Sequence, residues 1–234
     1  MNGIFITATD TEAGKTIVTG MLANYLLQKK LNVVTQKWIQ TGSNDSAGDI
    51  DTHLKLMKKT KSNFKNYLPL MTPYSFKLPA SPHLAAKKEN KNINSNKIKQ
   101  SFKKLSDNFD FVLVEGIGGA LVPVNTKSLV IDIAKDLSLD VILVAQNKLG
   151  AINHTLLTVE ALKKRNFNIL GIIFNNIARI RNPSILQDNP NIIKSLSKQN
   201  VLGTIPWSNN KSLLQKAFNP IGRKIYAQLK RKYQ

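Results

Sequence analysis

The sequence predicts an α/β protein with a doubly wound, mainly parallel sheet of about seven strands and helices on both faces. Apolar, β-branched runs recur along the chain at long intervals. Several of them are continuous, as in strands that are buried on both faces. Stretches with helical periodicity separate these runs, and this alternation favours a parallel sheet. The runs cover residues 3–8, 32–38, 111–116, 140–146, 168–174 and 201–207. We expect residues 1–234 to form a single domain.

Helical periodicity is clearest in three segments. The first two follow Lys15 and Gly150, and their apolar stripes consist of Ile17, Val18, Met21, Leu22, Tyr25 and Leu26, and of Ile152, Leu156, Val159 and Leu162. In the third segment, at residues 221–234, Ile221, Ile225 and Leu229 share one face among basic residues. A helix of this kind either docks on its own domain or binds a membrane or a calmodulin-like partner. We expect docking.

Composition excludes several classes of function. The 234 residues include no cysteine, which excludes disulfides, thiolate metal sites and cysteine nucleophiles. The N-terminal segment does not resemble a signal peptide and no apolar run approaches the ~20 residues of a membrane span, so we expect a cytoplasmic protein without a membrane partner. The formal net charge of +20 is compatible with a nucleic-acid partner. However, lysine greatly exceeds arginine, which favours a compositional origin of the charge and no nucleic-acid binding.

The segment at residues 8–16, "ATDTEAGKT", is typical of a phosphate-binding loop. It stands between an expected strand and an expected helix, so its backbone N–H groups and the helix N-terminus favour an anion. Lys15 is suited to the β- and γ-phosphates of a nucleotide, and the Thr16 hydroxyl to Mg²⁺. The strict pattern requires glycine where Thr9 stands, and the alternative is an ordinary strand-to-helix turn. We predict a P-loop NTPase-like fold whose nucleotide-binding residues include Glu12, Ala13, Gly14, Lys15, Thr16 and Ile17.

Charged side chains stand at the ends of two further expected strands. In "FVLVEGIGG", Glu115 follows four apolar residues at a strand end, where open α/β sheets bind ligands. A carboxylate there suits a metal ion, and the alternative is a cap on the next element. Lys37 ends the second strand, near Thr41, and is placed either to neutralise a transferred phosphoryl group or to lie solvated on the surface. Asp49 and Asp51 precede a helical stretch, and each is a candidate metal ligand or a helix N-cap.

Taken together, these segments resemble the dethiobiotin synthetase family, whose motifs occur here in the same order over about residues 3–207. "TATDTEAGKT" resembles that family's longer phosphate loop, with Ala8 in place of the usual glycine. "KWIQTG" resembles Lys-Pro-Val-x-[Ser/Thr]-Gly with Trp38 in place of proline, and "VEGIGGALVPV" carries Ile117 in place of alanine. Similar substrate-side, dimer-interface and adenine-side segments are "PYSFKLPASPHLAA", "NKLGAINHTLLT", "FNN" and "GTIPW". After Trp207 the family's frequent acid near the nucleotide sugar is missing, which leaves nucleotide preference open.

The resemblance implies an ATP- and Mg²⁺-dependent ligase that joins CO₂ to 7,8-diaminopelargonate and closes a cyclic urea. It implies a homodimer with the substrate site at the interface. Lys15 and Lys37 would be catalytic, while Thr16, Asp51 and Glu115 would hold Mg²⁺. Asp51 is preferred to Asp49 because "DTHLKL" fits the family's spacing better. The implied substrate-binding residues are Thr41, Gly150, Ala151, Ile152 and Asn153, and the further nucleotide-binding residues are Asp51, Glu115, Gly116, Ile117, Gly118, Asn175, Asn176, Pro206, Trp207 and Ser208.

Three other interpretations compete with this one. A partitioning-type P-loop switch ATPase that binds DNA would suit the basic charge. Such proteins usually carry an extra lysine early in the loop, where this sequence has Asp10, Thr11 and Glu12. A glutamine-dependent ligase with the same ATP core would need a nucleophilic cysteine, which is missing. A decayed enzyme that keeps only the fold is the third possibility, because Ala8, Trp38 and Ile117 depart from the family pattern.

Overall fold

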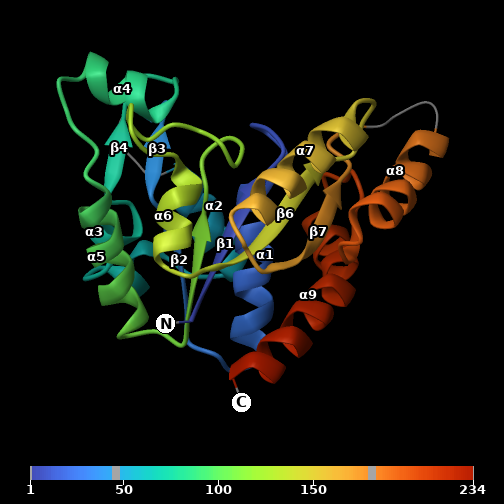
Figure 1. Ribbon diagram of the computed structural model, residues 1–234. Coiled ribbons are helices and arrows are strands. Elements are labelled where there is room, and N and C mark those ends of the chain that lie inside the picture. Colours follow the sequence, from blue (N-terminus) through green and yellow to red (C-terminus); the bar gives the residue numbers. More distant parts are fainter. Residues whose placement is uncertain (1, 44–47, 179–182, 234) are drawn as a thin grey trace.

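The computed structural model describes residues 2–43, 48–178 and 183–233. Within these residues the chain forms a central parallel sheet with helices on both faces (Figure 1). The strand order is β2-β5-β1-β6-β7-β8, and every neighbouring pair is parallel. The strands are β1 (Gly3–Ala8), β2 (Val33–Lys37), β5 (Phe111–Glu115), β6 (Asp140–Gln146), β7 (Ile169–Asn175) and β8 (Val201–Ile205). All six apolar runs of the sequence are therefore strands, and the α/β prediction is confirmed.

The main sheet has six strands, where about seven were predicted. The two remaining described strands, β3 (Ile39–Thr41) and β4 (Tyr74–Phe76), pair with each other in a separate two-stranded sheet. Strand β2 lies at the edge of the main sheet and ends at Lys37, and β3 begins only two residues later. The chain thus leaves the main sheet at Trp38, and β3 and β4 lie beyond its edge (Figure 1).

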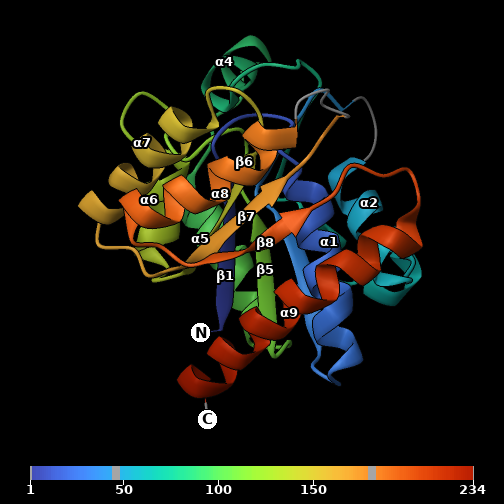
Figure 2. The same ribbon diagram turned by 90° about the vertical axis from the view of Figure 1, so that its right-hand side faces the viewer.

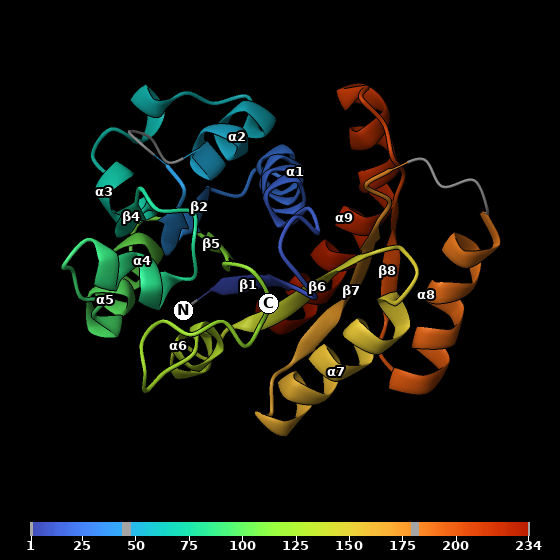
Figure 3. The same ribbon diagram turned by 90° about the horizontal axis from the view of Figure 1, so that it is seen from above.

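The two faces of the sheet carry different helices. Helices α1 (Lys15–Gln28) and α9 (Lys211–Tyr233) lie on one side, and α6 (Val130–Asp136) and α7 (Ala151–Lys164) lie on the other (Figure 3). Helix α1 packs against α2 and α9, and α7 packs against α8. The other helical segments are α2 (Gly48–Met57), η1 (Lys61–Phe64), α3 (Leu68–Met71), α4 (Pro82–Lys88), α5 (Ser95–Ser106) and α8 (Pro183–Ser197).

The C-terminal helix docks on the domain, as predicted. Figure 2 shows α9 running along β8 and beside α1. Ile221, Ile225 and Leu229 are at most 3% exposed, so the apolar stripe faces the core. Near the end of α9, Lys232 Nζ lies 2.7 Å from the buried carboxylate of Asp140 at the start of β6. No helix in the described part of the chain is long and apolar enough to span a bilayer.

The topology brings the ends of three strands together at one edge of the sheet. In the parallel register, Glu115 of β5 pairs with Ile6 of β1 on one side and with Lys37 of β2 on the other. Strand β1 lies between β5 and β6, so the loops that follow β1 and β5 open into a common crevice. Open α/β sheets bind ligands at such a position.

Candidate active site

The loop between β1 and α1 has the backbone geometry that its glycine requires. Gly14 precedes the first residue of α1 and has a φ of +97°, which L side chains rarely adopt. A Cβ on Gly14 would lie 2.1 Å from Nδ2 of Asn175, so the site has no room for a side chain. The Asn175 amide donates a hydrogen bond of 2.9 Å to the carbonyl of Ala13. Asn175, predicted to contact adenine, thus also holds the loop against the end of β7.

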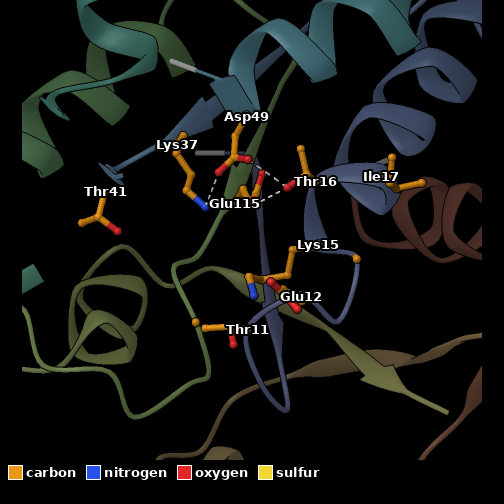
Figure 4. A pocket seen from close by; sticks show the side chains of 11 residues that line it. Thr11, Glu12, Lys15, Thr16, Ile17, Lys37, Thr41, Asp49 and Glu115 are labelled. Carbon is orange, nitrogen blue, oxygen red and sulfur yellow. Dashed lines mark hydrogen bonds and ion pairs between the residues drawn. The ribbon is translucent and has the colours of Figure 1, made fainter. Parts of the chain in front are cut away.

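Four polar side chains from separate elements meet beside this loop (Figure 4). Lys37 Nζ donates to Glu115 Oε1 at 2.8 Å and to the Gly116 carbonyl at 2.9 Å, and it lies 2.8 Å from Asp49 Oδ2. The Thr16 hydroxyl lies 2.9 Å from Glu115 Oε1 and 3.2 Å from Asp49 Oδ1. Two carboxylates and a hydroxyl oxygen therefore converge next to the phosphate loop, with one ammonium group between the carboxylates.

Burial and charge act in opposite directions on this cluster. Burial raises the pKa of Glu115, but the charge of Lys37 and the hydrogen bond with His53 outweigh it and lower the pKa to about 2. Burial lowers the pKa of Lys37, while Glu115 and Asp49 raise it more, so the net shift is upward. Lys15 differs, because burial and the nearby Lys37 lower its pKa to about 8. Its Nζ donates to the Asp10 carbonyl at 3.1 Å.

A fifth side chain, His53 of α2, completes the surroundings of Glu115. It is fully buried, and its Nε2 lies 2.7 Å from Glu115 Oε2. No motif in the sequence points to His53. The available signal was its spacing, because residues four apart share one face of a helix and Asp49 stands four positions earlier.

The two aspartates of α2 have different surroundings. Asp49 contacts Thr16 and Lys37, whereas Asp51 forms an exposed ion pair with Lys61 at 2.9 Å. Side chains two positions apart on an α-helix lie on different faces, so only one of the two acids reaches the cluster. The preference for Asp51 as a metal and nucleotide ligand stays a prediction from the sequence, and these contacts favour Asp49 as the alternative.

A pocket of about 500 Å³ lies over the cluster. Figure 4 shows Thr41 and Lys37 on one side of it and the loop residues Thr11 and Glu12 on the other. Six further predicted residues are among its lining, so most of the predicted phosphate and catalytic set gathers around one space. The full lining is Thr11, Glu12, Gly14, Lys15, Thr16, Ile17, Lys37, Thr41, Asp49, Glu115 and Gly118.

A second pocket, of about 570 Å³, adjoins the end of β7 and the start of α9. Its lining includes the predicted nucleotide-binding residues Asn176, Trp207 and Ser208, together with Leu213. The predicted substrate-binding residues 150–153 line neither this pocket nor the first one. Gly150 is the N-cap of α7, and its φ of +86° lies in the left-handed region that glycine adopts readily.

Comparison with known proteins decides the family. A family model described as an AAA domain matches residues 2–212. The ATP-dependent dethiobiotin synthetase of Thermodesulfovibrio yellowstonii is 36% identical over 212 residues, which cover 88% of each chain. The chain belongs to the ATP-dependent dethiobiotin synthetase family. The second such synthetase of Haemophilus influenzae is 40% identical over 174 residues, which cover 74% of this chain and 90% of that relative. The resemblance seen in the motifs is confirmed.

Solved structures similar to this dethiobiotin synthetase family member include proteins of cell division and plasmid partition. The MinC:MinD complex of Aquifex aeolicus matches with a TM-score of 0.61 at 14% identity and covers 98% of this chain and 96% of that chain. The pNOB8 ParA protein bound to nonspecific DNA matches with a TM-score of 0.58 at 15% identity, covering 98% and 99%. At such low identity the likeness shows a shared P-loop NTPase fold alone.

Two departures from the dethiobiotin synthetase pattern have a structural explanation. Trp38, in place of proline, is fully buried and stacks on Phe5 with ring centroids 5.3 Å apart. Its indole N–H donates to Gln36 Oε1 at 2.8 Å, so the large side chain is both packed and hydrogen-bonded. Ala8, in place of glycine, ends β1 and is fully buried, so its methyl group packs in the core. Neither substitution removes a polar group from the cluster around Glu115.

Proposed function

We propose that the protein catalyses the ATP-dependent closure of the urea ring of dethiobiotin from 7,8-diaminopelargonate and CO₂, with release of ADP and phosphate. As a member of the ATP-dependent dethiobiotin synthetase family it uses ATP and acts on small molecules. The observation that carries the proposal is that the phosphate loop, Lys37 and the Thr16, Asp49 and Glu115 oxygens meet in one pocket. These are the groups that enzymes use to transfer a phosphoryl group to a bound acceptor.

The reaction proceeds in three steps that need no covalent bond to the protein. One amine of the substrate adds to CO₂ and loses a proton, which gives a carbamate. A carbamate oxygen then attacks the γ-phosphorus of ATP, and ADP leaves. The second amine attacks the carbonyl carbon of the resulting mixed anhydride, the C–O bond to phosphate breaks, and the ring closes with loss of a proton. The protein's contribution is to align the reactants and to stabilise the charge that moves between oxygens.

Lys37 is the group that we assign to the developing charge. All three donors of its ammonium group have acceptors, in Glu115, Asp49 and the Gly116 carbonyl. Contact with a carbamate or phosphoryl oxygen therefore requires the exchange of one acceptor. Asp49 is the exchangeable one, because its side chain is 27% exposed toward the pocket while that of Glu115 is 1% exposed. Lys37 remains anchored to β5 through Glu115 while its third donor turns toward the reactants.

The triphosphate is assigned to the loop and the start of α1. Lys15 and Thr16 are the first two residues of that helix, whose N-terminus carries partial positive charge and unpaired N–H groups. Lys15 Nζ donates a hydrogen bond of 3.1 Å to the backbone carbonyl of Asp10. A charged phosphate oxygen is a stronger acceptor and would replace that contact. The adenine and ribose are assigned to the second pocket, where Asn176, Trp207 and Ser208 lie, and Asn175 and Pro206 directly precede two of these residues in the sequence.

Mg²⁺ fits the oxygen donors beside the loop. Thr16 Oγ1 lies within 3.2 Å of carboxylate oxygens of both Asp49 and Glu115, and hydroxyl and carboxylate oxygens are ligands that Mg²⁺ prefers. No group of three acidic, histidine or cysteine side chains suited to a metal gathers in the described ranges, so water and phosphate oxygens would complete the coordination shell. When bound, Mg²⁺ would neutralise charge on the transferred phosphoryl group and the departing ADP.

The carboxylate tail of the substrate is assigned to a second copy of the chain. Residues 150–153 form a helix N-terminus, which suits an anion, yet they line neither pocket of their own protomer. Large apolar side chains are exposed around α7: Leu149 is 82% exposed, Leu157 57% and Leu121 51%. Burial of such a surface favours association. A homodimer that covers this surface would bring residues 150–153 of one protomer toward the other protomer's pocket.

The test of the proposed function scores two products together. Purified protein is incubated with ATP, Mg²⁺, bicarbonate and diaminopelargonate, and dethiobiotin and ADP are quantified. We expect equal amounts of both, and no ADP beyond background when diaminopelargonate is omitted. ADP without dethiobiotin, especially if DNA stimulates its release, would overturn the proposal and support a switch ATPase. Nucleotide binding with neither product would indicate a decayed enzyme. We further propose that the protein acts in the cytoplasm, where ATP is available as its co-substrate.

A further inference from the structure

The two oxygens of the Glu115 carboxylate have different partners. Oε1 accepts from Thr16 at 2.9 Å and from Lys37 at 2.8 Å, so it faces the pocket side of the cluster. Oε2 lies 2.7 Å from His53 Nε2, on the side of α2. Both side chains are buried, at 0% and 1% exposure, so water does not compete for this contact. His53 therefore holds the oxygen that the proposed Mg²⁺ site does not use.

The chemistry of the pair fixes which ring nitrogen carries the hydrogen. An ionised carboxylate only accepts hydrogen bonds, so His53 Nε2 must donate. The other ring nitrogen, Nδ1, is buried and has no hydrogen-bond partner within the described part of the chain. A buried polar atom without a partner is costly, and an apolar side chain at this position would avoid that cost. Within the described part of the chain, the hydrogen bond to Glu115 is the one that offsets the cost of burying the imidazole.

The close packing of α1 against α2 determines where the His53 backbone lies. Gly20 of α1 lies so close to α2 that a Cβ there would be 3.3 Å from the His53 Cα and 2.9 Å from the Leu56 Cβ. The same helix α1 begins with the loop lysine and Thr16, and the same helix α2 carries Asp49 one turn before His53. The hydrogen bond from His53 therefore ties Glu115 of β5 to the helix that supplies the second carboxylate.

We propose that His53 is a positioning residue, which fixes the plane of the Glu115 carboxylate so that Oε1 stays directed at Thr16 and Lys37 for Mg²⁺-dependent nucleotide binding. The inference rests on the Mg²⁺ site of the proposed function. Without the imidazole, Oε2 would be a buried acceptor with no donor, and the carboxylate would turn to share both oxygens with Lys37. Hydrogen-bond partners behind metal ligands typically contribute 10–100-fold to metal affinity.

The experiment measures the Mg²⁺ requirement of nucleotide binding without turnover. Full-length protein is titrated with Mg²⁺ at a fixed concentration of a non-hydrolysable ATP analogue, and analogue affinity is also measured in EDTA. We expect His53→Leu to raise the Mg²⁺ concentration for half-maximal binding by about tenfold or more, with unchanged affinity in EDTA. His53→Gln keeps an N–H donor near the Nε2 position and should largely restore the wild-type requirement. Lys55→Leu, at an exposed position of the same helix α2, is the matched control.

Each other result counts against the inference. An unchanged Mg²⁺ requirement in His53→Leu overturns it, and so does a Gln variant as impaired as the Leu variant, because packing rather than the hydrogen bond would then be responsible. If His53→Leu does not fold, His53→Met supplies an unbranched apolar side chain that adapts to the cavity. If wild-type binding is independent of Mg²⁺, the metal site itself fails and the inference with it. If wild-type binding depends on Mg²⁺ and the apolar His53 variant has the same Mg²⁺ requirement, the role of His53 is overturned while the proposed metal site stands.

Discussion

Lys37 and Glu115 are partners in the parallel register of β2 and β5, and their side chains form an ion pair of 2.8 Å at the ends of these strands. Their side chains are only 5% and 1% exposed. A buried ion pair adds little net stability compared with apolar packing, but loss of one partner leaves a buried charge and costs about 3–5 kcal/mol. A chain that keeps such a pair beside a phosphate loop is therefore expected to use it in function.

Replacement of Lys37 should separate catalysis from nucleotide binding. In Lys37→Ala the transferred charge has no ammonium group to stabilise it, so dethiobiotin formation should fall by about 100-fold or more. Binding of a non-hydrolysable ATP analogue should be largely spared, because the loop and Lys15 hold the phosphates. Product assays and calorimetry measure the two effects. Lys61→Ala, which removes an exposed partner of Asp51, serves as the control and should leave both unchanged. Turnover close to wild type in Lys37→Ala would refute the assigned role.

The two aspartates of α2 offer a matched pair. Asp49→Asn should raise the Mg²⁺ concentration needed for half-maximal analogue binding by about tenfold or more, because a charged ligand becomes neutral. Asp51→Asn changes the charge of the protein equally but lies on another face of the helix, so its Mg²⁺ requirement should match wild type. The measurement is a Mg²⁺ titration followed by calorimetry. The reverse ranking of the two variants would support the preference for Asp51 made from the sequence.

The sequence predicted those parts of the site that a local pattern determines. Glu115 ends a continuous apolar run and Lys37 ends a β-branched one, and the end of a buried strand in a parallel sheet lies at the ligand-binding edge. Lys15 and Thr16 follow from the spacing of the phosphate loop. The strand positions followed equally well from β-branched apolar runs. In each case the information lies within about ten neighbouring residues, which is the range of these patterns.

What the sequence did not predict depends on helix phase and on contacts between distant segments. Asp49 and Asp51 have the same chemistry, and only the rotation of α2 against α1 brings Asp49 to Thr16. His53 looks like a core histidine until β5 is placed beside it, because its partner Glu115 is far away in the sequence. Asn175 contacts the loop carbonyl of Ala13 through tertiary structure alone.

The ionisation of Glu115 should make the free energy of unfolding depend on pH in acidic solution. Its pKa of about 2 in the folded state is below the ordinary value of 4.5, so the charged form stabilises the fold. This contribution is complete above pH 4.5 and is lost as the pH falls through 4.5 toward 2. Urea unfolding of wild type and Glu115→Gln should therefore differ most near pH 7. Below pH 4.5 the difference should shrink by up to about 1.4 kcal/mol per pH unit.

The same titration with Glu160→Gln gives the control, because Glu160 is exposed on α7 and its replacement should leave the unfolding free energy unchanged at each pH. Other carboxylates contribute equally to wild type and variant, so they cancel in the difference. A difference between wild type and Glu115→Gln that stays constant down to pH 3 would show that Glu115 is not held ionised by Lys37 and His53.

Lys15 should take up a proton when nucleotide binds in alkaline solution. Burial and the nearby Lys37 lower its pKa to about 8, so the free protein holds Lys15 charged at pH 7 and mostly neutral at pH 9. A bound phosphate chain favours the charged form and raises this pKa again, so binding near pH 9 should absorb about one proton and binding at pH 7 very little. Calorimetry in buffers of different ionisation enthalpy measures this uptake.

Lys15→Arg keeps its charge at both pH values and should show no uptake, whereas Lys211→Arg, at an exposed position, should behave as wild type. Nucleotide phosphates are fully ionised at pH 9 and do not contribute. Equal uptake in wild type and Lys15→Arg would show that the proton goes elsewhere and that Lys15 does not bind the phosphates in the charged form.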